Sequence, residues 1–167
     1  MLGAESFKNN RCDGIIAIGG GSPMDLAKGV GIISTNGGMI VDYKGVDMIT
    51  KAIPPMIFIP TTAGTSADVS QFGIISDTKK KIKVAIVSKN IIPDVALIDY
   101  ETTLTMDNYL TACTGIDAFT HAIEAYVSKV SSPLTDIHAI EAIKNQKQPQ
   151  MRLLFFFPLH FLLNKAC

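Results

Sequence analysis

The sequence predicts an α/β portion, built on a parallel sheet with a βαβ unit, that is followed by the start of an all-α domain. Residues 14–18 (GIIAI) and 56–59 (MIFI) are short, continuously apolar runs, which is the pattern of buried parallel strands. Between them, residues 23–33 carry apolar side chains at helical spacing, and a glycine pair follows shortly afterwards. After Thr105 the apolar period is helical, so the chain passes from α/β to all-α.

The segments after the βαβ unit predict further strands and then helices. Two β-rich runs, residues 72–76 and 82–87, flank a lysine-rich turn and predict a hairpin whose turn is solvated. Residues 95–98 predict another short buried strand. Helices are expected over residues 110–113 and 116–127 and from Pro133, which takes the first helical position after Ser132.

Length and composition limit the class of protein. A chain of 167 residues suits one compact core, since domains usually take roughly 100 to 200 residues. Hydrophobic residues make up 47% and charged residues 18%, with 15 basic and 15 acidic side chains, which argues against disorder and against nucleic-acid binding. A boundary near residues 99–105 would divide the chain into residues 1–102, residues 103–147 and an atypical apolar tail, residues 148–167.

Two features bear on the cellular compartment. The apolar run 151–163 (MRLLFFFPLHFLL) is shorter than the roughly 20 residues of a membrane helix and is interrupted by Arg152, Pro158 and His160, so no membrane span is expected. Cys12, Cys113 and Cys167 have no C-x-x-C spacing, and the N-terminus lacks the pattern of an export signal. Reduced thiols in a cytoplasmic protein are therefore expected.

A glycine-rich loop, residues 19–25 (GGGSPMD), joins the first predicted strand to the first predicted helix. Glycines let a backbone approach a pyrophosphate closely, and free N–H groups at a helix N-terminus attract anions. A plain tight turn is the alternative, with Ser22 capping the helix and Asp25 completing a capping-box-like pair. The loop is not G-x-G-x-x-G, and no G-K-[ST] follows, which disfavours phosphoryl transfer.

The second predicted strand also ends in small and hydroxylated residues, residues 61–66 (TTAGTS). Because open α/β sheets bind ligands at the carboxyl ends of their strands, two such loops together favour a nucleotide site. An ordinary glycine-containing loop is the alternative for the second segment alone.

A possible metal pair lies on a predicted helix. Asp117 and His121 are four residues apart and therefore share a helix face, with Glu124 three residues further on. A carboxylate and an imidazole at this spacing can chelate a divalent ion, and the alternative is a hydrogen bond between the two side chains. A catalytic metal takes three or more protein ligands, whereas the contexts of His138 and His160 do not favour ligation.

Three segments in this order, GIIAIGGGSPMDLAK, IPTTAGTS and TGIDAFTHAIEAYVS, resemble signature segments of the iron-containing (group III) alcohol dehydrogenases. The resemblance runs from about residue 13 to residue 143. It implies a dehydroquinate synthase-like architecture and NAD(P)-dependent interconversion of alcohols and aldehydes, with a divalent metal as Lewis acid.

The resemblance also implies a role for individual residues. Gly20, Gly21 and Ser22 would hold the cofactor pyrophosphate with Asp25 nearby, Thr61, Thr62 and Thr65 would line the nucleotide and nicotinamide site, and Lys83 would contact the cofactor. Asp117 and His121 would be the first two ligands of Fe²⁺ or Zn²⁺, whereas Glu124 would not be a ligand.

Departures from the family pattern leave the activity of the chain open. The first βα segments would precede position 1, and the resemblance stops near Lys144, before the two remaining histidine ligands, so an incomplete architecture truncated at both ends is expected. Residues 66–68 (SAD) replace a Gly-Ser-Glu-like stretch, and Tyr100 replaces a common proline.

Three functions therefore remain. They are an alcohol dehydrogenase fragment, active only if a partner subunit lends ligands, an inactive nucleotide-binding remnant that lacks two metal ligands, and a related lyase or polyol dehydrogenase, against which the close match of the helical motif speaks. The expected partner is a small alcohol or aldehyde, with no nucleic acid and no membrane, and a homo-oligomer is left open.

Overall fold

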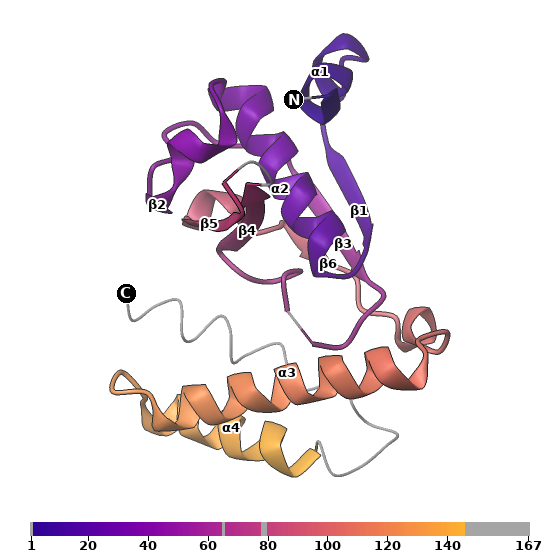
Figure 1. Ribbon diagram of the computed structural model, residues 1–167, viewed down its shortest axis with the longest axis vertical. Helices are drawn as coiled ribbons and strands as arrows, with labels where there is room; N and C mark the ends of the chain where they lie inside the picture. Colours follow the sequence, from indigo (N-terminus) through magenta and orange to yellow (C-terminus); the bar gives the residue numbers. More distant parts are fainter. Residues whose placement is uncertain (1, 65, 78–79, 146–167) are drawn as a thin grey trace.

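The computed structural model describes residues 2–64, 66–77 and 80–145 (Figure 1). Among the residues expected to form a site, Thr65 lies outside this described part, as does the apolar tail, residues 148–167. Figure 1 shows two parts: an α/β portion with mixed helices and strands, and a pair of helices that lies beneath it.

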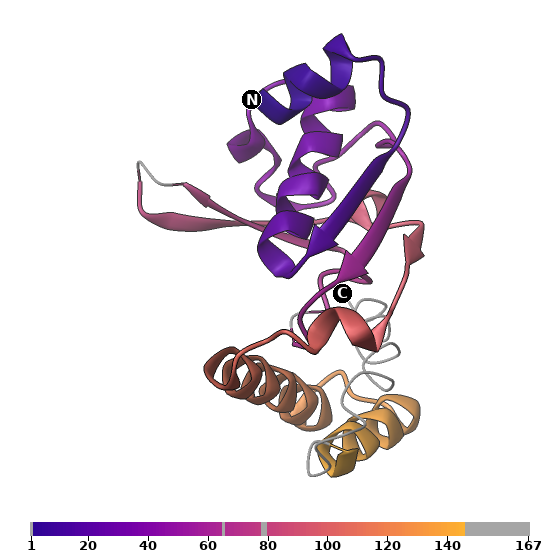
Figure 2. The ribbon, with the colours of Figure 1, turned by 90° about the vertical axis from the view of Figure 1, so that its right-hand side faces the viewer.

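The first sheet contains the predicted βαβ unit. Strands β1 (Ile15–Gly19), β3 (Met56–Pro60) and β6 (Val95–Ala96) are parallel in the order β1-β3-β6, and helix α2 (Gly21–Asn36) connects the first two (Figure 2). The first strand alternates, with Ala17 buried and the isoleucines beside it exposed. The expectation that this strand is buried on both faces is therefore wrong, because among the described residues helix α2 covers only one face of the sheet.

The second sheet contains the predicted hairpin and one strand that the sequence pattern missed. Strands β4 (Phe72–Asp77) and β5 (Ile82–Val87) are antiparallel, and the short strand β2 (Gly45–Val46) pairs with β5 in parallel. Short 3-10 helices cover Ile40–Tyr43, Lys89–Ile91 and Tyr100–Thr103.

Helix α2 packs between the two sheets, and its buried residues contribute to two apolar clusters. The first cluster contains Met24, Met56 and Phe58, and the second contains Ile32 and Ile86. The central helix therefore fixes both sheets relative to its own N-terminus.

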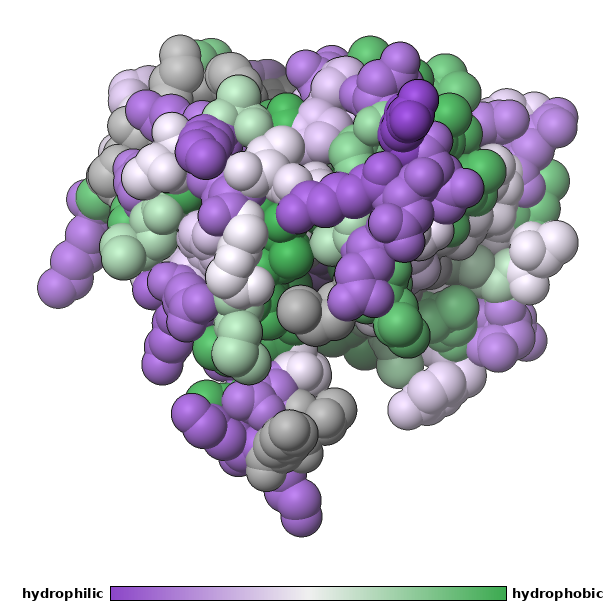
Figure 3. All heavy atoms as spheres, turned by 90° about the horizontal axis from the view of Figure 1, so that it is seen from above, coloured by the Kyte–Doolittle hydropathy of each residue, from purple (hydrophilic) through white to green (hydrophobic). Residues whose placement is uncertain are grey.

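Helix α1 (Leu2–Asn9) packs against α2, with Gly3 so close that a Cβ there would lie 2.7 Å from Val30 Cγ2. The sequence pattern predicts no helix for this segment. Seen from above, the surface of this end mixes hydrophilic and hydrophobic side chains (Figure 3).

The helix pair comprises α3 (Asn108–Val127) and α4 (Pro133–Asn145). The expected interruption near Gly115 is wrong: α3 is one continuous helix of 20 residues, since a single glycine costs a helix only about 1 kcal/mol. Asp107 caps it by accepting a hydrogen bond from Leu110 N–H at 2.7 Å. In the part of the chain that the structure describes, no helix has the length and apolar character needed to cross a membrane.

Candidate functional site

The glycine loop after β1 leaves the first turn of α2 open to an anion. Gly20 rather than Ser22 occupies the N-cap position, and it has no side chain that could accept from the free N–H groups. The alternative in which Ser22 caps the helix is therefore wrong, because Ser22 is the second residue of the helix. Gly19 has φ +148°, and a Cβ on it would lie 2.7 Å from Pro23 Cγ. This cradle suits a phosphate at the helix N-terminus.

The loop after β3 lies directly beside the glycine loop. Thr61 N–H donates to the carbonyl oxygen of Gly19 at 2.9 Å, and a Cβ on Gly20 would lie 3.1 Å from Thr62 Oγ1. Both threonines are partly buried. The two segments singled out in the sequence therefore meet at the carboxyl ends of adjacent parallel strands, where such sheets bind ligands.

The other two residues expected to serve the cofactor, Asp25 and Lys83, lie outside these two loops. Lys83 is on β5 of the second sheet, opposite Ser76 in the hairpin register, and its side chain is exposed. Asp25 lies on α2, partly buried, and accepts a hydrogen bond from the backbone N–H of Ile74 in β4. Asp25 thus links α2 to the hairpin of β4 and β5.

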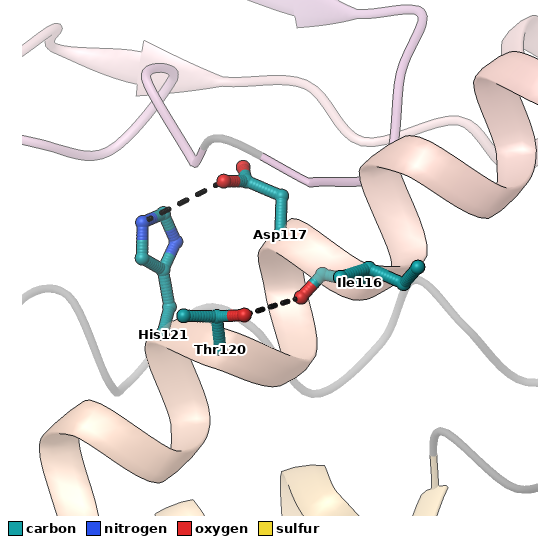
Figure 4. Close-up of polar contacts among 4 residues, drawn as sticks. All are labelled: Ile116, Asp117, Thr120 and His121. Carbon is teal, nitrogen blue, oxygen red and sulfur yellow. Dashed lines mark hydrogen bonds and ion pairs between the residues drawn. The ribbon is translucent and has the colours of Figure 1, made fainter.

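The expected metal pair shares one face of α3. Asp117 Oδ1 and His121 Nε2 are 4.0 Å apart, with the side chains 45% and 33% exposed (Figure 4). One carboxylate oxygen and one imidazole nitrogen, both accessible, suit two positions around a divalent ion. Glu124 is exposed on the next turn. Within the described ranges, no group of three or more His, Cys, Asp or Glu residues is placed to hold a metal ion.

A close backbone contact joins the loop after β3 to helix α3. Gly64, in the loop after β3, lies so near α3 that a Cβ on it would be 2.9 Å from the carbonyl oxygen of Thr114. Thr114, Asp117 and His121 are spaced so that they fall on one helix face. Figure 4 shows Asp117 and His121 on the side of α3 that faces the α/β portion.

The sequence pattern did not single out one buried lysine on α2. Lys28, on α2, is 1% exposed, and its ammonium donates to the carbonyl oxygens of Ser70 at 2.9 Å and Phe72 at 2.7 Å. The ammonium also lies 5.9 Å from the centre of the Phe58 ring. The available signal was its spacing of three residues from Asp25, which puts both side chains on one face of the helix.

Burial shifts the pKa values of three charged groups in this cluster. It lowers the pKa of Lys28 to about 8, an effect that the carboxylates of Asp25 and Asp68 oppose. Burial raises the pKa of Asp25, against the Lys28 charge and the hydrogen bond from Ile74. It also raises the pKa of Asp68, against a hydrogen bond from the residue's own backbone and the Lys28 charge.

Sequence comparison identifies relatives with this arrangement of segments. Residues 1–100 match the family described as "Iron-containing alcohol dehydrogenase", and residues 111–148 match "Fe-containing alcohol dehydrogenase family, C-terminal". The NAD-dependent methanol dehydrogenase of Bacillus methanolicus is 43% identical over 142 residues, which is 85% of this chain and 37% of that protein. The 1,3-propanediol dehydrogenase of Citrobacter freundii is 44% identical over the same shares. The chain thus spans about 37% of the length of these relatives.

Solved structures agree with the fold. A 1,3-propanediol oxidoreductase superposes with a TM-score of 0.86 at 36% identity, covering 98% of this chain and 45% of that one. The NAD⁺ complex of sulfoacetaldehyde reductase from Bifidobacterium kashiwanohense gives a TM-score of 0.76 at 32% identity, covering 98% and 44%. The expected fold class, an α/β portion followed by helices, is confirmed.

Proposed function

The chain belongs to the iron-containing alcohol dehydrogenase family, and from that premise we propose that it serves NAD(P)-dependent interconversion of small alcohols and aldehydes. The observation that carries this proposal is the contact of Gly64 with Thr114: the loop after β3, which is hydrogen-bonded to the glycine loop, lies beside the face of α3 that holds Asp117 and His121. Hydride transfer to or from a nicotinamide requires a cofactor loop and a substrate-binding group in such proximity.

In this proposal the α/β portion holds the dinucleotide. The uncapped first turn of α2, with Gly20, Gly21 and Ser22, binds the pyrophosphate. The loop after β3 lies against the nucleotide and the nicotinamide through Thr61, Thr62 and Thr65, while Asp25 lies nearby and Lys83 contacts the cofactor from the hairpin. The NAD-dependent relative supports NAD as the cofactor, and NADP stays an alternative to test.

The helix pair supplies part of a metal site. Asp117 offers a carboxylate oxygen and His121 an imidazole nitrogen, a donor set that Fe²⁺ and Zn²⁺ both accept. When bound, such an ion supplies Lewis-acid polarisation of the substrate oxygen, and the nicotinamide accepts or donates the hydride. The residues of α3 then orient the substrate toward the loop after β3.

The names of the relatives guide the substrate class. One is a methanol dehydrogenase and another acts on 1,3-propanediol, so we propose a short primary alcohol or diol and the matching aldehydes.

The exposed, unpaired thiols of Cys12 and Cys113 support a cytoplasmic location.

A second candidate is dinucleotide binding without turnover. The observation in its favour is that the described residues bring together only two ligand side chains, whereas a catalytic metal takes three or more. The two candidates share the cofactor loops and differ in the metal.

The test uses the full chain, purified with Fe²⁺ or Zn²⁺ supplied, and measures metal content, NADH binding and turnover of ethanol, 1,3-propanediol and acetaldehyde. Stoichiometric metal with turnover supports the dehydrogenase, and NADH binding without metal or turnover supports the second candidate. Asp117→Ala is expected to weaken metal binding at least about 10-fold, whereas the control Glu124→Gln leaves it unchanged. A chain that binds neither metal nor NADH would refute both candidates.

A further inference from the structure

We propose that Lys28 is a positioning residue that holds the far end of the loop between β3 and β4, so that this loop keeps its place beside the glycine loop. The consequence for the cofactor rests on the function proposed above. The evidence is that Lys28, on α2, donates to the carbonyl oxygens of two residues that lie 42 and 44 positions further along the sequence.

The near end of this loop is fixed by the first sheet. It leaves β3 at Pro60, and the next residue, Thr61, donates its N–H to the carbonyl oxygen of Gly19 at the end of β1. Thr102 Oγ1 also donates to the carbonyl oxygen of Pro60 at 2.6 Å. The start of the loop therefore has a defined position relative to the glycine loop.

The far end of the loop is fixed by the lysine. The Lys28 ammonium donates to Ser70 O at 2.9 Å, to Ser70 Oγ at 3.3 Å and to Phe72 O at 2.7 Å. An ammonium has three N–H donors, so these three acceptors satisfy it completely. The two carbonyls lie where the loop ends and β4 begins.

The chemistry of this position argues that the side chain is there for its donors. Burying a charge is costly unless the charge is hydrogen-bonded and paired, and an apolar side chain of similar size could fill the same space. Asp25 on the same helix and Asp68 in the loop carry the opposing charges, and the Phe58 ring lies on the remaining side. A merely space-filling position would not need this arrangement.

Through the hydrogen bonds of Lys28, helix α2 positions both the glycine loop and the loop after β3. Gly21, at the N-terminus of α2, lies in the glycine loop, and Lys28 lies about two turns along the same helix. A displacement of the second loop relative to the first would have to break the contacts of Lys28. Since the loop after β3 also touches α3 through Gly64, its position sets the spacing between cofactor and metal helix.

The test compares Lys28→Met, which keeps most of the side-chain length and removes the donors, with Ile32→Val, a buried substitution one turn further along α2. Amide hydrogen exchange of residues 61–72 and the Kd for NADH are measured on the full chain. Lys28→Met is expected to speed exchange in this segment about 10-fold and to weaken NADH binding about 5-fold, roughly the loss of one or two net hydrogen bonds. Ile32→Val leaves both within about twofold of wild type, and Ser70→Ala, which removes only the longest contact, has an intermediate effect.

The outcomes separate this inference from the function on which it rests. The proposal that Lys28 holds the loop is overturned if amide exchange in residues 61–72 is unchanged in Lys28→Met. It is also overturned if exchange rises equally in Ile32→Val. Faster exchange with unaltered NADH affinity overturns its role in cofactor positioning. If the wild-type chain binds no NADH, the proposed function fails together with that role, and hydrogen exchange alone decides whether Lys28 holds the loop.

Discussion

The α/β portion and the helix pair bury different kinds of side chain. In the α/β portion the buried clusters include large side chains, such as Met24 and Phe58 in one cluster and Ile32 and Ile86 in the other. Between α3 and α4 the buried apolar cluster consists of four alanines, Ala122, Ala125, Ala139 and Ala142. The larger apolar side chains of these helices remain partly or mostly exposed in the described structure, including Ile116 at 67% and Ile137 at 64%.

This difference means that less buried apolar surface stabilises the helix of Asp117 and His121 than stabilises the glycine loop and the loop after β3. Burial stabilises by about 25 cal/mol per Å² of apolar surface, so an alanine contact contributes far less than a contact between large side chains. The cofactor loops are held by a core within the α/β portion, whereas Asp117 and His121 lie on a helix with little buried surface of its own. The predictions below test this asymmetry.

The largest effect is expected for Phe58→Ala in β3. The ring is completely buried, and its removal leaves a cavity, so the free energy of unfolding should fall by about 3–5 kcal/mol. Ile57→Ala is the matched control, because its side chain is 38% exposed in the same strand and its loss should cost less than half as much. Urea unfolding followed by circular dichroism measures both. Equal losses would show that the first cluster does not carry the stability of the α/β portion.

The buried charge of Lys28 should give the α/β portion a distinctive pH dependence. The pKa of this amine is about 8 in the folded protein and 10.5 in the unfolded chain, so between these values unfolding takes up a proton. The free energy of unfolding should therefore rise from pH 8 to pH 10.5, by on the order of 3 kcal/mol. The raised pKa values of Asp25 and Asp68 act at acid pH: stability declines as the pH rises from the ordinary pKa of these groups in the unfolded chain to their raised pKa in the folded protein.

Lys28→Met provides the reference for this experiment, because it removes this one amine and leaves the rest of the sequence unchanged. The difference in unfolding free energy between the wild type and Lys28→Met, measured at pH 8, 9 and 10, should increase in favour of the wild type. A difference that is constant with pH would mean that Lys28 keeps an ordinary pKa in the folded protein.

A smaller effect is expected where the two portions meet, at Gly64. In Gly64→Ala the new Cβ would lie 2.9 Å from the carbonyl oxygen of Thr114, so the loop and α3 must separate, at a cost of about 2 kcal/mol. The control is Gly14→Ala, whose Cβ would lie at an ordinary 3.4 Å from the carbonyl oxygen of Pro55. Thermal unfolding should show a lower Tm for Gly64→Ala alone. Equal Tm values would mean that the contact does not hold the portions together.

Sequence patterns predicted the parts of the fold that local residues determine. The βαβ unit and the hairpin were predicted because strand and helix periods differ within a few residues. Strand β2 has only two residues and is defined by its partner β5, so no local pattern could indicate it. The exposed face of β1 was also missed, because an apolar run does not reveal which elements are present to cover it.

In the candidate site, too, only the parts that local sequence determines could be predicted. The adjacency of the glycine loop and the loop after β3 followed from their positions after parallel strands, and the pairing of Asp117 with His121 followed from helical spacing. Lys28 could not be interpreted in this way, because its acceptors at Ser70 and Phe72 are more than 40 residues away in the sequence. Contacts of that range depend on the packing of the whole portion.

The smallest effect concerns the backbone of the loop after β3. Ser66 has φ +50°, which lies in the left-handed region, where a residue with a side chain costs about 1 kcal/mol more than glycine. Ser66→Gly should relieve this strain, although the greater freedom of glycine in the unfolded chain offsets part of the gain, so the expected stabilisation is about 0.5 kcal/mol. Ser76→Gly, at an extended position in β4, should destabilise by about as much, since glycine weakens a strand. Urea midpoints that move in opposite directions would show that the α/β core holds this loop against its local preference. A shift of Ser66→Gly in the destabilising direction would mean that the serine hydroxyl contributes more than the strain costs.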